Sequence, residues 1–116
     1  QACIAGSRLF IHESIYAPLM ARLLELTRGL RVGHPFTDGV HVGPLIGDEH
    51  RQSVQAYVEL AKREGGRVLC GGEIPADPHL ANGSFFQPTI IEGLSNSARA
   101  CQEEIFGPVL VASRSR

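Results

Sequence analysis

Segments whose apolar residues recur at helical spacing are mixed along this chain with short apolar runs typical of strands. This order of elements limits the folds that the chain can adopt. Strand-like runs cover residues 8–12, 67–70, 85–91 and 108–112. Two longer segments with helical spacing lie between the first run and the second. This order favours an α/β architecture, in which crossover connections make at least part of the sheet parallel.

The first helical segment begins near Ser14, whose hydroxyl can cap the free amides of a first turn. Pro18 then lies in that turn, where a missing amide costs least, and Gly29 marks the end of the helix. One apolar stripe consists of Ile15, Leu19, Leu23, Leu26 and Leu30. A second stripe beside it consists of Tyr16, Met20 and Leu24. We expect the longer, leucine-rich stripe to be core rather than a partner surface.

The second helical segment begins near Asp48, a good capping residue, and ends before Gly65-Gly66. Its apolar positions follow the helical period: Val54, Tyr57, Val58 and Ala61. The segments 32–47 and 73–84 are rich in glycine or proline and predict loops. Pro88 is tolerated in the third strand-like run only at an edge or a bulge. A short helix is expected over residues 97–103.

Composition excludes several classes of partner. The chain has 11 basic and 12 acidic residues and a net charge of -1, so we expect neither a nucleic-acid nor a membrane-surface partner. Apolar runs such as 109–112 are far shorter than the roughly 18 residues that a membrane span needs.

The cysteines and histidines predict neither a disulfide framework nor a metal site. Cys3, Cys70 and Cys101 are odd in number and unpaired in spacing, which favours a reducing, cytoplasmic compartment. The sequence contains no C-x-x-C or H-x-x-x-H pair, so we expect no metal. Cys70 and Cys101 are expected to be packing residues.

Two short motifs near the ends of the chain could carry chemistry. Cys3 lies among small uncharged neighbours, where a cysteine is usually a buried hydrophobe and less often a nucleophile. Glu103-Glu104 precedes Phe106 and a Gly-Pro turn. This carboxylate pair is either the solvated end of a helix or a site that accepts hydrogen bonds from ribose hydroxyls.

Taken together, these motifs resemble those of the aldehyde dehydrogenase family. Gln1-x-Cys3-x-Ala5-x-Ser7-Arg8 is similar to the family's active-site cysteine segment, and residues 103–109 are similar to its E-E-I-F-G-P signature. Intervening segments match in order: Val32-Gly33-x-Pro35, Gly43-Pro44-Leu45-Ile46, Gly65-Gly66-x-Val68-Leu69-Cys70-Gly71-Gly72 and Phe86-x-Pro88-Thr89. The resemblance implies that residues 1–116 are part of an α/β catalytic domain, with a partly parallel sheet flanked by helices, and that the Rossmann-like cofactor domain is absent.

The resemblance also implies roles for individual residues. Cys3 matches the nucleophile, which attacks a small-molecule aldehyde to give a thiohemiacetal and, after hydride transfer to NAD or NADP, a thioester. Glu104 matches the residue that binds the nicotinamide ribose, and Phe106 the aromatic beside the nicotinamide ring. The parent enzyme is expected to be a homo-oligomer that oxidises its aldehyde to a carboxylic acid.

The departures from the family pattern are as informative. The family's general base and its oxyanion asparagine lie outside this chain, and after Ala112 the apolar pattern gives way to Ser-Arg-Ser-Arg. We therefore expect a truncated piece that binds no cofactor alone and is inactive alone. Two alternatives stay open: a module that acts by self-association or partner binding, and slow cofactor-free thiol chemistry, such as ester hydrolysis, at Cys3.

Overall fold

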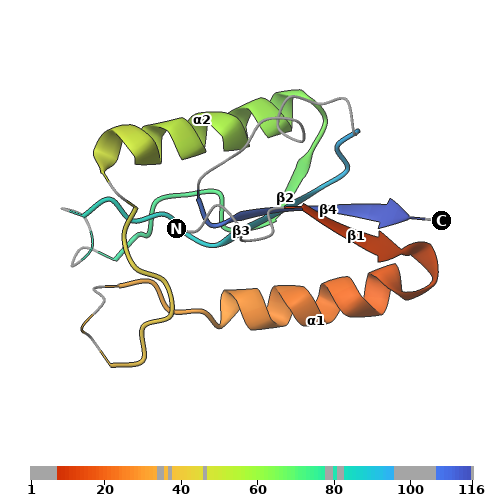
Figure 1. Ribbon diagram of the computed structural model, residues 1–116, viewed down its shortest axis with the longest axis horizontal. Coiled ribbons are helices and arrows are strands. Elements are labelled where there is room, and N and C mark those ends of the chain that lie inside the picture. The colour runs from red at the N-terminus through yellow and green to blue at the C-terminus, as the bar shows by residue number, and fades with distance from the viewer. Residues whose placement is uncertain are drawn as a thin grey trace.

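A mixed four-stranded sheet lies between two helices (Figure 1). The structure is a computed structural model that describes residues 8–33, 36, 38–45, 47–77, 80, 83–95 and 107–115. The strands of this described part are β1 (Arg8–His12), β2 (Arg67–Cys70), β3 (Thr89–Glu92) and β4 (Val109–Ser115). Helix α1 (Tyr16–Arg28) follows a single 3-10 turn, η1 (Glu13–Ile15), and helix α2 (Asp48–Arg63) covers the opposite face of the sheet.

The sheet order is β1-β4-β3-β2, so the last strand lies between the first and the third. Strand β4 pairs in parallel with both of its neighbours, with Arg8 opposite Val111 and Thr89 opposite Val109. Strands β2 and β3 are antiparallel, with an irregularity between Val68 and Cys70. The predicted α/β class with a partly parallel sheet is therefore confirmed.

Each face of the sheet has its own apolar core, because successive residues of a strand point to opposite sides. On the α2 side, the core includes Val54, Val58, Ala61, Phe86, Ile91 and Val111. On the α1 side, it consists of Ile11, Tyr16, Met20, Ile90 and Ala112. The buried face predicted for the second helix is confirmed, with Tyr57 partly buried beside it.

The face of α1 that packs on the sheet differs from the predicted one. Tyr16 and Met20 are buried, whereas four members of the leucine-rich stripe are exposed: Ile15 by 51%, Leu19 by 41%, Leu26 by 53% and Leu30 by 40%. Leu23 and Leu24 are partly buried against the α1-side core. The two stripes lie side by side, so periodicity shows that α1 is amphipathic without showing which half of its broad apolar face meets the sheet.

The predicted start of α2 near Asp48 is confirmed, although its cap is Gly47. Several other predictions at the ends of elements are wrong. The cap of η1 is His12 and not Ser14, because Nδ1 of His12 accepts from the Ser14 amide. Strand β3 begins only at Thr89, since Pro88 has no amide to donate. Strand β4 continues to Ser115, because pairing with β1 extends it past Ala112. The helix expected over 97–103 lies outside the described residues.

Two of the glycines that have a positive φ differ in one respect, because a side chain would overlap with neighbouring atoms at only one of them. Gly71 has φ 70°, and a Cβ there would lie 2.2 Å from the carbonyl oxygen of Pro88. Gly65 has φ 96°, and a Cβ there would meet no heavy atom within 4 Å.

We predict that Gly65→Ala lowers the unfolding free energy by about 1–2 kcal/mol, because it adds backbone strain alone. Gly71→Ala should lower it by about 3–5 kcal/mol, because it adds strain and steric overlap. Urea denaturation measures both, and equal losses would contradict the assigned overlap.

Candidate functional site

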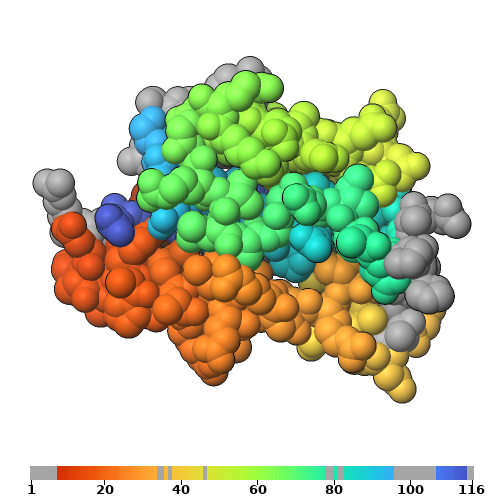
Figure 2. Space-filling model, turned by 180° about the vertical axis from the view of Figure 1, so that it is seen from behind, coloured from red at the N-terminus to blue at the C-terminus, as the bar shows by residue number. Residues whose placement is uncertain are grey.

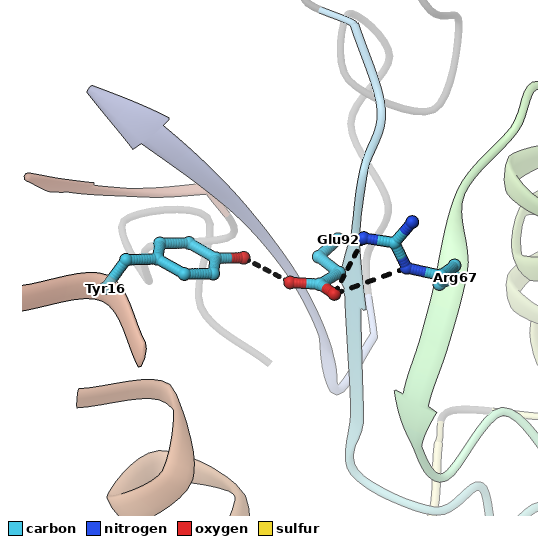
Figure 3. Close-up of polar contacts among 3 residues, drawn as sticks. All are labelled: Tyr16, Arg67 and Glu92. Carbon is cyan, nitrogen blue, oxygen red and sulfur yellow. Dashed lines mark hydrogen bonds and ion pairs between the residues drawn. The ribbon is translucent and has the colours of Figure 1, made fainter. Parts of the chain in front are cut away.

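A polar cluster of three residues joins α1, β2 and β3 (Figure 3). The Tyr16 hydroxyl donates to Oε2 of Glu92 at 2.5 Å. Arg67 donates to the other oxygen, Oε1, from Nη2 at 3.0 Å and from Nε at 3.3 Å. Arg67 and Glu92 are opposite each other in the antiparallel pair of β2 and β3, so the sheet register brings the ions together.

A second cation completes this cluster. The guanidinium of Arg114, near the end of β4, lies 4.3 Å from the centroid of the Tyr16 ring. A cation at this distance is attracted by the negative face of the aromatic ring. The cluster therefore joins the first residue of α1 to three strands, and a cleft of about 310 Å³ lies beside it, lined also by Gly93, Leu94, Ser95, Ala112 and Ser113.

The protonation states of Tyr16 and Glu92 favour a structural role for their contact over a role in acid–base catalysis. Burial, together with the hydrogen bond to Glu92, raises the pKa of Tyr16 to about 12. The hydrogen bond from Tyr16, aided by Arg67, lowers the pKa of Glu92 against the opposing effect of burial. At neutral pH the phenol is thus held neutral and the carboxylate ionised, and each already has a strong partner.

Cys70 lies at a second cleft, of about 360 Å³, beside the C-terminal end of α1. Its side chain is partly buried and packs against the α1-side core. Burial raises the pKa of this thiol, so it is protonated at neutral pH and poorly nucleophilic. The prediction that Cys70 is a packing residue is confirmed, whereas Cys101 lies outside the described residues.

The three site residues expected from the resemblance, Cys3, Glu104 and Phe106, also lie outside the described residues. The structure describes the strands that follow them. Strands β1 and β4 are parallel neighbours, so the chain enters both from the same edge of the sheet (Figure 1).

The end of the E-E-I-F-G-P motif is held on both sides. The carbonyl oxygen of Pro108 accepts from the Thr89 amide at 2.8 Å. A Cβ at Gly107 would lie 2.8 Å from Cγ2 of Val54 in α2, which shows how closely the backbone approaches that helix. Any larger residue here would force the Val54 side chain to move.

Sequence reasoning missed the Tyr16–Glu92–Arg67 cluster. Tyr16 was predicted only as a member of an apolar stripe, and nothing in the local sequence of Arg67 or Glu92 marks them. Antiparallel pairing of residues 67–70 with residues 89–92 would have placed the two charges opposite each other. The long proline-containing segment between these runs gives no sign of that pairing.

The described residues contain neither a metal-holding cluster nor a membrane-spanning helix. Within these ranges, no group of three or more His, Cys, Asp or Glu side chains is arranged to hold a metal ion. Likewise, no helix of the described chain is long and apolar enough to cross a membrane.

Comparison with known proteins gives a consistent result over the whole chain. The model of the aldehyde dehydrogenase family matches residues 1–116. The chain is 42% identical over 110 residues to betaine aldehyde dehydrogenase of Bacillus subtilis (strain 168), covering 95% of this chain and 22% of the relative. It is 40% identical over 112 residues to 4-trimethylaminobutyraldehyde dehydrogenase of Oryzias latipes, with the same coverage.

Solved structures agree with this similarity. Betaine aldehyde dehydrogenase from Staphylococcus aureus, in complex with NAD+, matches with a TM-score of 0.96 and 35% identity, over 99% of this chain and 23% of that one. PnpE from Pseudomonas sp. WBC-3, in complex with nicotinamide adenine dinucleotide, matches with a TM-score of 0.95, 41% identity and the same coverage. The chain thus spans less than a quarter of the length of these relatives.

The Tyr16–Glu92 hydrogen bond predicts a specific loss of stability at high pH. The pKa of Tyr16 rises from 10.0 to about 12 on folding, so its contribution is complete below pH 10 and is lost as the pH rises towards 12. We predict that Tyr16→Phe lowers the unfolding free energy at neutral pH by about 1.5–3 kcal/mol and flattens the alkaline decline. Denaturant melts between pH 7 and 12 measure both effects.

Tyr57→Phe is the matched control, because it removes the chain's other phenol and leaves the Glu92 contact intact. The alkaline slope should change more in Tyr16→Phe than in this variant, because the Tyr16 phenol is the one that donates to Glu92. An unchanged slope in Tyr16→Phe would show that the contact does not control stability.

Proposed function

Because the chain belongs to the aldehyde dehydrogenase family, we propose that it supplies the nucleophile and the cofactor-ribose contact of an NAD(P)-dependent aldehyde oxidation. The observation that carries this proposal is the family match over residues 1–116, which includes both terminal motifs. Their cysteine and glutamate, Cys3 and Glu104, are of the residue types that this chemistry needs.

Cys3 carries the covalent steps in this proposal. Its thiolate forms a bond to the aldehyde carbon, and the backbone amide of Cys3 donates to the oxygen that becomes negative. Loss of hydride from that carbon leaves a thioester, which water cleaves to release the carboxylic acid and the thiol. NAD or NADP, when bound, accepts the hydride.

The side chains of the second motif fit a nicotinamide nucleotide. A carboxylate at Glu104 accepts hydrogen bonds from both ribose hydroxyls, and the ring of Phe106 offers a flat apolar surface to the nicotinamide. Two of the similar solved structures hold this cofactor. The choice between NAD and NADP depends on parts of the family fold that lie outside this chain.

The parallel pairing of β1 and β4 supports a single site built from both motifs. Cys3 lies five residues before Arg8, and Glu104 lies five residues before Val109. A chain segment of this length spans at most about 18 Å, and both segments join the same edge of the sheet. A thiol and a ribose-binding carboxylate can therefore serve one substrate–cofactor pair.

We propose that the chain by itself does not turn over. It spans about 22% of the length of the curated relatives it matches, and the general base and cofactor domain expected from the family lie outside it. A reducing, cytoplasmic setting, which keeps the Cys3 thiol available, belongs to the same proposal.

The names of the relatives suggest which aldehydes to test first. They include betaine aldehyde dehydrogenases and a 4-trimethylaminobutyraldehyde dehydrogenase. We therefore propose aldehydes with a trimethylammonium group as the first substrate class, with uncharged aliphatic and aromatic aldehydes as comparators.

A chimera tests the proposed chemistry. Residues 1–116 replace the matched segment of the Bacillus subtilis relative, which supplies the remainder of the fold. We predict aldehyde-dependent NADH formation that Cys3→Ser lowers by at least about 10³-fold. Glu104→Gln should raise the KM for NAD+ by about tenfold, which corresponds to the loss of one good hydrogen bond.

Thermal unfolding provides the control for the chimera. A chimera that unfolds as cooperatively as the unmodified relative, but forms no NADH with Cys3 intact, would contradict the proposal. NADH formation that survives Cys3→Ser would contradict the role given to Cys3.

The isolated chain provides a separate test. We predict no heat of binding with NAD+ or NADP+, and no NAD(P)H fluorescence after addition of the aldehydes. A signal that Cys3→Ser abolishes would contradict the proposed inactivity while supporting the chemistry. Ester hydrolysis that is lost in the same variant would identify the cofactor-free thiol reaction instead.

A further inference from the structure

Thr89, the first residue of β3, has a buried side chain that makes two hydrogen bonds. It is only 2% exposed, and it is the one polar residue among the buried residues of the described chain. Its Oγ1 accepts from the amide of Gly72 at 2.8 Å and donates to the carbonyl oxygen of Gln87 at 2.7 Å. Removing this hydroxyl is costly, because it leaves a buried amide and a carbonyl without their partner.

The bond to Gly72 lies where the regular pairing of the sheet ends. The register between β2 and β3 shifts between Val68 and Cys70, and the chain then passes through two glycines with positive φ, Gly71 and Gly72. Figure 2 shows the segment that contains β2 and the residues after it, coloured green to teal, between α1 and α2. The β2–β3 ladder ends at Cys70, so the Thr89 hydroxyl is the group that holds the Gly72 amide to β3.

The main chain of Thr89 connects the same point to the E-E-I-F-G-P motif. Its amide donates to the carbonyl oxygen of Pro108 at 2.8 Å, and Thr89 lies opposite Val109 in the parallel register of β3 and β4. The amide of Val109 in turn donates to the carbonyl oxygen of Gly107 at 2.8 Å. One residue therefore joins the turn after β2 to the last two residues of the motif.

We propose that Thr89 is a positioning residue for the cofactor contact of Glu104. Its hydroxyl fixes the start of β3, and its amide then fixes the Pro108 carbonyl at the end of the motif. Glu104 lies only four residues before Pro108, a length that spans at most about 14 Å, so movement of Pro108 moves the point from which this segment extends. The inference rests on the proposed role of Glu104 in binding the nicotinamide ribose.

Amide hydrogen exchange of the 116-residue chain, followed by NMR, tests the structural step without any cofactor. Thr89→Val keeps the branched shape and removes the hydroxyl, so the Gly72 amide loses its acceptor. We predict exchange at least about tenfold faster at Gly72 and also at Val109, whose amide is bonded within the motif. Thr89→Ser keeps the hydroxyl and should retain slow exchange at Val109. Faster exchange at Gly72 alone, or at neither amide, would overturn the proposal.

Thr27→Val is the matched control, because it makes the same chemical change at another threonine whose hydroxyl donates to a main-chain carbonyl, that of Leu23, at 2.7 Å. Thr27 belongs to α1, on the opposite face of the sheet from the core that contains Val109. Exchange at Val109 should be unchanged in this variant. Faster exchange there would show that loss of any such threonine bond loosens this part of the sheet, which contradicts a specific role for Thr89.

Calorimetric titration of NAD+ into the chimera tests the functional step. Thr89→Val should raise the Kd for NAD+ by about tenfold, as the loss of one good hydrogen bond would, and Thr89→Ser by less than about twofold. A positioning residue acts only through the contact that it positions. Thr89→Val combined with Glu104→Gln should therefore bind NAD+ no more weakly than Glu104→Gln alone. Additive losses of affinity would contradict the proposal.

The same titration separates this proposal from the dehydrogenase function on which it rests. Binding of NAD+ needs no turnover, so a chimera that binds NAD+ without forming NADH would contradict the chemistry given to Cys3 alone. An unchanged Kd in Glu104→Gln would contradict the ribose contact itself. Loss of affinity in Glu104→Gln but not in Thr89→Val would leave that contact standing and overturn the role of Thr89.

Discussion

Strand β4 is the element on which the rest of the structure depends, because it alone joins the two ends of the chain within the described sheet. It hydrogen-bonds in parallel to β1 on one side and to β3 on the other. Its Val111 enters the core beneath α2, and its Ala112 enters the core beneath α1. Both helices are therefore positioned relative to a strand whose partners lie far away in sequence. The same pairing leads the segments before β1 and β4 to one edge of the sheet.

The contact of Tyr16 with Glu92 then determines how α1 lies on that sheet. A buried hydroxyl needs a partner, and the only face of α1 that carries this tyrosine is the face with Met20. Arg67 and Arg114 complete the contact from β2 and β4. With Tyr16 and Met20 inward, four members of the leucine-rich stripe point outward, while Leu23 is partly buried against the core. The polar contact and the packing of Met20 therefore act on the same face of the helix.

Local sequence predicted the elements whose signals are local. The bounds of β1 and β2 and the buried face of α2 followed from short apolar runs and a clear helical period. The inner face of α1, the start of β3 after Pro88 and the extension of β4 to Ser115 depend on partners distant in sequence, so periodicity could not predict them. The family motifs predicted Cys3, Glu104 and Phe106 as site residues, and these remain predictions because they lie outside the described residues.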